Sequence, residues 1–181
     1  FKIMLPPYNN TKEALANQAC YIEIEKCKKP IGVQDQYAAA YGGFNQMRFG
    51  TDINKGDYKE VKGFGFCDQD LRSLSDHMSL FYTGVTRESR EILSTQQNNL
   101  ITSQEVVSLM HKNVIVADQL SEQLRYKEID AIPAAMRENW ELKKKFADSI
   151  SNKELDNIYD RARTVGEARA GKLMGAGGGG F

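Results

Sequence analysis

The sequence has 181 residues, 41% hydrophobic and 27% charged, a balance typical of a folded globular protein and not of a disordered chain. Its 24 basic and 24 acidic residues cancel, so the net charge favours neither nucleic acid nor an anionic membrane surface as a partner. No apolar run approaches the ~20 residues of a membrane span, and no signal peptide opens the chain. We therefore expect a cytoplasmic protein.

Cysteine and histidine do not suggest a metal site. Cys20, Cys27 and Cys67 lack CxxC spacing, and neither His77 nor His111 stands at metal-ligand spacing from them. We expect reduced, unliganded cysteines. Both ends of the sequence look cut, because it begins without Met and stops directly behind a glycine run, so we also expect a fragment.

The first predicted element is a helix over residues 11–27. Asn10 and Glu13 have the spacing of a capping box, and Leu15, Ala19 and Ile22 recur at helical intervals.

Residues 30–43, PIGVQDQYAAAYGG, predict a turn followed by a helix start that carries Asp35. The helix dipole and the free backbone N–H groups at this end favour an ionised carboxylate. Two interpretations stay open. Asp35 caps the helix, or it is a base beside a polar ligand that Gln34 and Gln36 help to orient.

The middle of the chain predicts strands. Residues 44–49 and 58–64 are expected to form a hairpin, and the apolar run 78–82 (MSLFY), closed by Thr83 and Gly84, is typical of a buried strand.

The remainder predicts helices, the first of them capped by Thr86 and spanning residues 87–97. Ser151 and Glu154 form a capping box for the last, which stops at Gly166. Apolar residues at steps of three and four are interpreted as core. They are Val107, Met110, Val114, Ala117, Leu120, Leu124, Ile132, Met136, Trp140, Leu155, Ile158, Ala162 and Val165. The layout is α+β, with a domain boundary expected near residue 98.

A glycine run ends the chain, GKLMGAGGGG over residues 171–180. Glycines let successive backbone N–H groups converge on an anion. The run is no Walker A loop, because Leu173 stands where a hydroxyl should hold Mg²⁺, and its GxGxxG pattern alone is weak. A flexible linker is the alternative, but the strand-like residues 172–174 favour a packed or phosphate-facing loop.

Four blocks taken together resemble the GHMP sugar kinases, in particular their heptose 7-phosphate kinase branch. They are PIGVQDQYAAAYGGFN at 30–45, LFYTGVTR at 80–87, ENWELKKKF with ISNKELDNIYDRA, and GKLMGAGGGGF at the end. The resemblance runs in the same order from about Thr11 to Phe181.

The resemblance implies a two-lobed α+β kinase, with residues 1–97 in the N-terminal catalytic lobe and 98–181 as the C-terminal domain. Such an enzyme transfers the γ-phosphoryl group of ATP, with Mg²⁺, to a sugar hydroxyl. Here the expected target is the anomeric hydroxyl of a heptose 7-phosphate. A sugar or sugar phosphate is thus the expected partner.

The resemblance also implies roles for particular residues. Asp35 matches the catalytic aspartate, which would accept or orient the proton of the attacking hydroxyl. Substrate contacts are expected from Gln34, Gln36, Tyr82, Thr83 and Arg87, although Arg87 could equally be a solvated surface residue. Cofactor contacts are expected from Gly175, Ala176, Gly177, Gly178 and Gly179.

Two motifs of the family are not found in this sequence. The first motif and the PxxxGLGSS loop, which holds ATP phosphates and supplies a Mg²⁺-binding serine, have no match. We therefore expect the metal ligands outside this sequence and the isolated chain to be inactive. A fucokinase-like or other sugar-1-kinase, or a non-catalytic binding module that retains the fold, are the alternatives.

Overall fold

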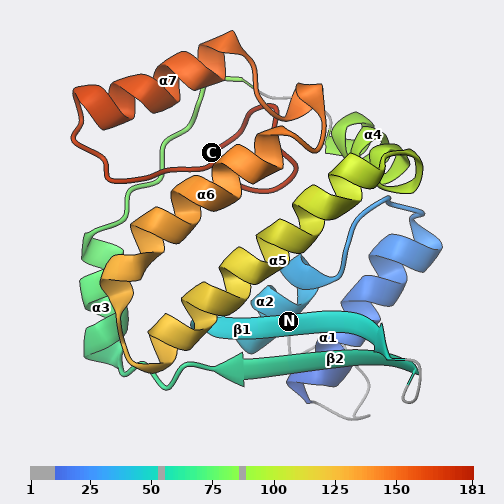
Figure 1. The fold of residues 1–181 in the computed structure, drawn as a ribbon. Helices are drawn as coiled ribbons and strands as arrows, with labels where there is room; N and C mark the ends of the chain where they lie inside the picture. The colour runs from blue at the N-terminus through green and yellow to red at the C-terminus, as the bar shows by residue number, and fades with distance from the viewer. Residues whose placement is uncertain (1–10, 53–55, 86–88) are drawn as a thin grey trace. The chain divides into compact units, whose positions relative to one another are not determined.

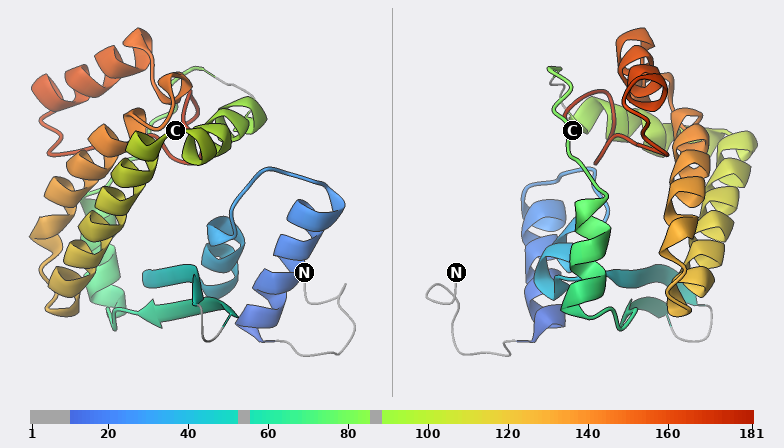
Figure 2. Two further views of the ribbon diagram at one scale, coloured as in Figure 1. Left: turned by 45° about the vertical axis from the view of Figure 1, so that its right-hand side comes forward. Right: turned by 90° about the vertical axis from the view of Figure 1, so that its left-hand side faces the viewer.

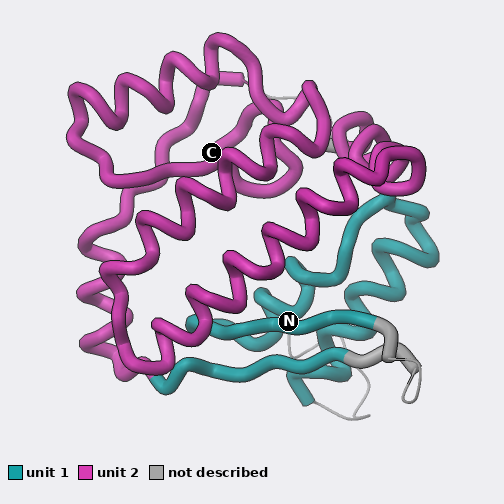
Figure 3. The backbone as a smooth tube through the Cα atoms, viewed as in Figure 1, with its two compact units in different colours: residues 1–65 teal, residues 66–181 magenta. Residues whose placement is uncertain are grey.

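The computed structural model describes residues 11–52, 56–85 and 89–181, and the chain divides into two compact units, residues 1–65 and 66–181 (Figure 3). The first unit combines helices with a two-stranded sheet and the second is helical in its described residues, so the predicted α+β class is confirmed. The division between the units falls at a different place from the lobe boundary expected near residue 98, which stays a prediction. Among the described residues, no helix is long and apolar enough to span a membrane.

The first unit opens with helix α1 (Lys12–Cys20), which a π-helical turn η1 (Tyr21–Lys26) continues (Figure 1). The predicted helix over 11–27 is confirmed, but its N-cap is Thr11. The Thr11 backbone is still extended, and its hydroxyl accepts a hydrogen bond from the Ala14 N–H at 3.1 Å. Asn10, the expected cap, lies outside the described residues.

Helix α2 (Gln34–Tyr41) is followed by the predicted hairpin, β1 (Asn45–Asp52) paired antiparallel with β2 (Gly56–Gly63). Tyr37 anchors this unit, because its side chain is 1% exposed and packs with Ala16 of α1. The Tyr37 ring meets the Phe49 ring edge-on at 5.2 Å, and its hydroxyl donates to Asn17 Oδ1 at 2.9 Å. The helices and the hairpin therefore share one small core.

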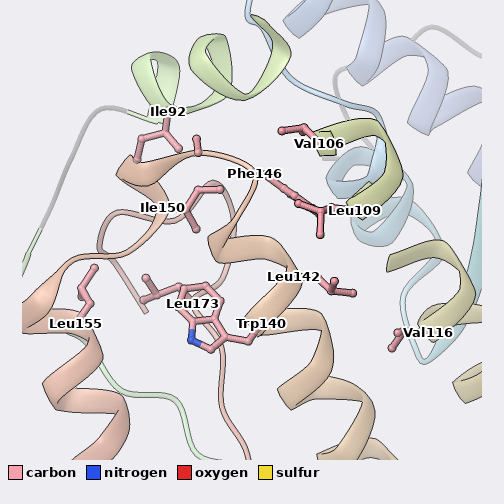
Figure 4. Close-up of a cluster of buried hydrophobic side chains, with 11 residues drawn as sticks. Ile92, Val106, Leu109, Val116, Trp140, Leu142, Phe146, Ile150, Leu155 and Leu173 are labelled. Atoms are coloured by element: carbon pink, nitrogen blue, oxygen red, sulfur yellow. The ribbon is translucent and has the colours of Figure 1, made fainter. Parts of the chain in front are cut away.

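The second unit is helical. Its elements are α3 (Asp68–Asp76), α4 (Ser89–Thr102), α5 (Gln104–Arg125), η2 (Ile129–Ala131), α6 (Ile132–Lys144), η3 (Asp148–Ile150) and α7 (Lys153–Thr164). Helices α5 and α6 run antiparallel and side by side in every view (Figures 1 and 2). The apolar core gathers around Trp140 and Ile150, which are 2% and 0% exposed (Figure 4).

The strand predicted at residues 78–82 is wrong. This segment is extended but belongs to no strand, and Leu80 and Phe81 are 63% and 69% exposed. A strand needs a neighbour for its backbone N–H and C=O groups, and the sheet of the described residues contains β1 and β2 alone. Residues 172–174 likewise form no strand.

The helices from α4 onward were predicted, whereas α3 was not, and the details of the predicted helices differ. In α5 the buried apolar residues are Val106, Leu109, Val116 and Leu124. Leu124 is thus buried as predicted, whereas the predicted core residue Val114 is 53% exposed.

The ends of two helices also differ from prediction. Helix α4 begins at Ser89, and Thr86 lies outside the described residues. Helix α7 is capped by Asn152, whose Oδ1 accepts from the Leu155 N–H at 3.0 Å, and not by Ser151. The Ser151 hydroxyl instead donates to Asp156 Oδ1 at 2.8 Å. Asn152 takes the cap because its side-chain oxygen reaches the open N–H groups of the first turn.

Candidate functional site

Asp35 lies in the first turn of α2 with its carboxylate exposed to solvent. The N-cap of this helix is Val33, and no side chain makes the capping hydrogen bond, so the capping interpretation of Asp35 is wrong. Across the described part of the chain, no hydrogen bond or ion pair engages the Asp35 carboxylate. The group is therefore open to a ligand and stands where the helix dipole favours negative charge.

The two glutamines beside Asp35 have different environments. Gln34 is exposed, whereas Gln36 is 7% exposed and donates from Nε2 to Glu23 Oε1 at 3.2 Å. The Gln36 Oε1 atom is buried without a hydrogen-bond partner. Gln36 thus ties α2 to η1, while Gln34 shares the surface with Asp35; contact of either with a substrate stays a prediction.

The Glu23 carboxylate gives the first unit a pH dependence that can be measured. Lys29 Nζ at 2.9 Å, and then Gln36, hold the pKa of Glu23 below its usual value of 4.5. A lowered folded-state pKa stabilises the folded form above pH 4.5, and this contribution is lost as the pH falls through the lowered pKa. We expect Glu23→Gln to be less stable than the unsubstituted chain at pH 7 and the two to converge at acid pH. Urea unfolding between pH 7 and pH 3 checks this, and a pH-independent difference contradicts it.

The glycine run forms a packed loop, so the linker interpretation is wrong. The Gly178 N–H donates to the Ile150 carbonyl and the Gly180 N–H to the Val85 carbonyl, each at 2.8 Å. A Cβ atom on Gly179, where φ is +150°, would lie 2.5 Å from the Val85 carbonyl oxygen. Glycine is therefore required there by contact as well as by backbone conformation.

The structure brings the LFYTG block to this loop. The backbone N–H and the hydroxyl of Thr83 both donate to the Gly180 carbonyl at 2.8 Å. The Tyr82 ring lies 5.3 Å from the Phe181 ring. Two of the predicted substrate residues, Tyr82 and Thr83, thus stand beside the predicted cofactor loop. Arg87, the third of that block, lies outside the described residues.

Helix α6 supplies contacts to the loop that sequence reasoning missed. Lys143 donates from Nζ to the Gly175 carbonyl, and Lys172 donates to Asn139 Oδ1 at 2.7 Å. Desolvation of the ammonium group lowers the pKa of Lys172. The one sequence signal was the basic run KKK at the end of α6, which gives no indication of the loop as its partner.

The loop can offer hydrogen-bond donors to an anion. Within the described chain, the N–H groups of Ala176, Gly177 and Gly179 donate no hydrogen bond, whereas those of Gly178 and Gly180 are used internally. Backbone N–H groups presented by glycines suit the oxygens of a phosphate. A metal site is different, because the described residues contain no cluster of three or more His, Cys, Asp or Glu side chains.

Comparison with known proteins gives two matches. Residues 120–181 match the family "GHMP kinases C terminal". A D-glycero-alpha-D-manno-heptose 7-phosphate kinase of Campylobacter jejuni is 31% identical over 171 residues, which are 92% of this chain and 48% of that protein. The chain therefore spans about half the length of the curated relative it matches.

Proposed function

We propose that this chain is part of an ATP-dependent sugar kinase, because residues 120–181 match the family "GHMP kinases C terminal". The proposed reaction moves the γ-phosphoryl group of ATP to the anomeric hydroxyl of a heptose 7-phosphate. The heptose is proposed because a relative with 31% identity is a heptose 7-phosphate kinase. The family match by itself supports a sugar kinase without indicating which sugar it phosphorylates.

The observation that carries this proposal is the open carboxylate of Asp35 at the start of α2. In the proposed reaction this carboxylate accepts or orients the proton of the sugar hydroxyl that attacks ATP. A group in this role must be within reach of a substrate and free of competing partners. Asp35 is exposed, and no described residue bonds to its carboxylate.

The glycine loop is the proposed contact to the nucleotide. Its unused N–H groups at Ala176, Gly177 and Gly179 would donate to phosphate oxygens. ATP supplies the phosphoryl group, and Mg²⁺ would neutralise the charge on its phosphates. The described residues contain no group of three or more His, Cys, Asp or Glu that could hold a metal ion, and we assign none of them to Mg²⁺.

A panel of acceptors tests the proposal in the protein expressed from its complete gene. We expect ADP release that depends on heptose 7-phosphate and not on free fucose or galactose. The 181-residue chain alone should show no turnover above background, because phosphoryl transfer relies on positioning and electrostatic stabilisation by motifs that this sequence does not match.

Three outcomes would contradict the proposal in different ways. Activity on fucose or galactose, but not on the heptose phosphate, overturns the heptose assignment in favour of another sugar-1-kinase. No ADP release with any acceptor favours the non-catalytic binding module. Sugar-dependent turnover by the 181-residue chain would show that it holds a complete active site.

A further inference from the structure

Helix α6 holds the segment that leads into the glycine loop at three points. Arg137 donates to the Arg169 carbonyl at 2.7 Å, Lys172 reaches Asn139 at 2.7 Å, and Lys143 donates to the Gly175 carbonyl. Hydrogen bonds therefore hold residues 169–175 along α6. Lys143 makes the last of these contacts, at Gly175, the second glycine of the run 171–180.

Contact with neighbouring atoms does not fix Gly175, unlike later glycines of the loop. A Cβ atom on Gly177 would lie 2.9 Å from the Ile150 carbonyl oxygen, so Gly177 packs closely against Ile150. Around the equivalent position of Gly175 there is nothing within 4 Å, and its φ is +64°. Glycine peptide units change orientation at little steric cost. Among the described residues, the hydrogen bond from Lys143 is the contact that favours the observed orientation of the peptide between Gly175 and Ala176.

That orientation decides where an N–H group points. In a trans peptide the C=O and N–H bonds point in opposite directions. Because the Gly175 carbonyl is turned toward the Lys143 ammonium, the Ala176 N–H is turned away from it. This N–H donates no hydrogen bond in the described chain, so it is available to an anion. A flipped peptide would present the carbonyl oxygen to the anion and repel it.

We propose that Lys143 is a positioning residue that keeps the Ala176 N–H directed toward a nucleotide phosphate. This inference rests on the proposed function for the identity of the anion. The orientation of the peptide, by contrast, is inferred without reference to the proposed function. The role differs from direct phosphate binding, because the ammonium group acts through the Gly175 carbonyl.

The orientation can be tested in the 181-residue chain by ¹H–¹⁵N NMR of the loop. We expect Lys143→Met to move the backbone resonances of Gly175, Ala176 and Gly177. Lys143→Arg, which keeps a charged donor, should restore them largely. Lys145→Met is the matched control, since it removes the same charge from an exposed residue just past the end of α6. If Lys143→Met moves these resonances no more than Lys145→Met does, the inference is overturned.

The consequence for the phosphate is tested in the protein expressed from its complete gene. Loss of a hydrogen bond from a charged donor should raise KM for ATP roughly tenfold in Lys143→Met, with a smaller change in kcat. Lys143→Arg should recover most of the loss, and Lys145→Met should match the unsubstituted protein. An unchanged KM for ATP overturns the role of Lys143. Absence of ATP-dependent activity in the unsubstituted protein instead overturns the proposed function, while the NMR result still decides the orientation.

Discussion

Asp35→Ala is expected to lower kcat by roughly 10³-fold in the protein expressed from its complete gene, within the range typical for loss of a general base. The folded state should change little, because the Asp35 carboxylate makes no hydrogen bond or ion pair in the described part of the chain. The helix loses a favourable charge near its N-terminus, which costs about 0.3–1 kcal/mol. Steady-state kinetics and urea unfolding of the same preparation separate the two effects.

Glu13→Ala is the matched control for Asp35→Ala. Glu13 is also an exposed acidic residue in the first turn of a helix, α1, so its removal changes the net charge and the helix end in the same way. We expect its kcat to stay within about twofold of the unsubstituted protein, since it has no proposed chemical role. Equal losses in the two variants, or an Asp35→Ala protein that unfolds while each folded molecule stays active, would make Asp35 a structural residue.

Gly179→Ala is expected to destabilise the second unit by about 3 kcal/mol, the upper part of the cost for a residue forced into a sparsely populated backbone region. The new Cβ atom would lie 2.5 Å from the Val85 carbonyl oxygen, at a φ of +150°. It would also disturb Gly180, which pairs with Thr83 and Val85. Trp140 reports the unfolding, because it is the single tryptophan of the sequence and is buried in the core of this unit.

Gly175→Ala is the comparison for Gly179→Ala. It places the same methyl group in the same loop, but at a position with nothing within 4 Å and a φ of +64°. The left-handed conformation alone should cost about 1–2 kcal/mol. If the two variants lose the same stability, the close contact between Gly179 and Val85 does not constrain the loop.

Local sequence patterns predicted those helices and strands whose own residues indicate the secondary structure. The hairpin of β1 and β2 follows from two β-type runs with turn residues between them, and α2 follows from alanines bounded by glycines. Helix α5 was predicted, but its buried face only in part: Leu124 is buried as predicted, whereas Val106 is buried in place of the adjacent Val107, which fits a helical stripe equally well. The choice between them depends on the core of the second unit.

Other features depend on partners distant in sequence. The apolar run 78–82 reads as a strand, yet strand formation requires a neighbour, and the described residues provide none there. Helix α3 is an exception, because it was missed although its signals are local: Asp70 accepts from the Cys67 N–H at 3.0 Å, and Leu71 and Leu74 are at helical spacing.

The candidate site likewise contains residues that local motifs indicate and residues whose roles depend on partners distant in sequence. Asp35 and the glycine loop were singled out from motifs, because the proposed chemistry would require those residue types at that spacing. Gln36 could not be predicted to turn inward, since its bond to Glu23 joins residues 13 positions apart. Lys143 was missed for the same reason, because Gly175 lies 32 positions away. Sequence patterns thus indicated the residues proposed to contact a ligand more readily than the residues that hold their neighbours in place.

We propose that the Asp35 carboxylate assists transfer of a phosphoryl group to a sugar hydroxyl. ³¹P NMR of the protein expressed from its complete gene, mixed with ATP, Mg²⁺ and heptose 7-phosphate, tests it most directly. We expect ADP and a second sugar phosphate signal, coupled to the anomeric proton, to grow together in the unsubstituted protein and to be nearly absent in Asp35→Ala. Growth of that signal at the same rate in both proteins, or release of inorganic phosphate alone, would contradict the claim.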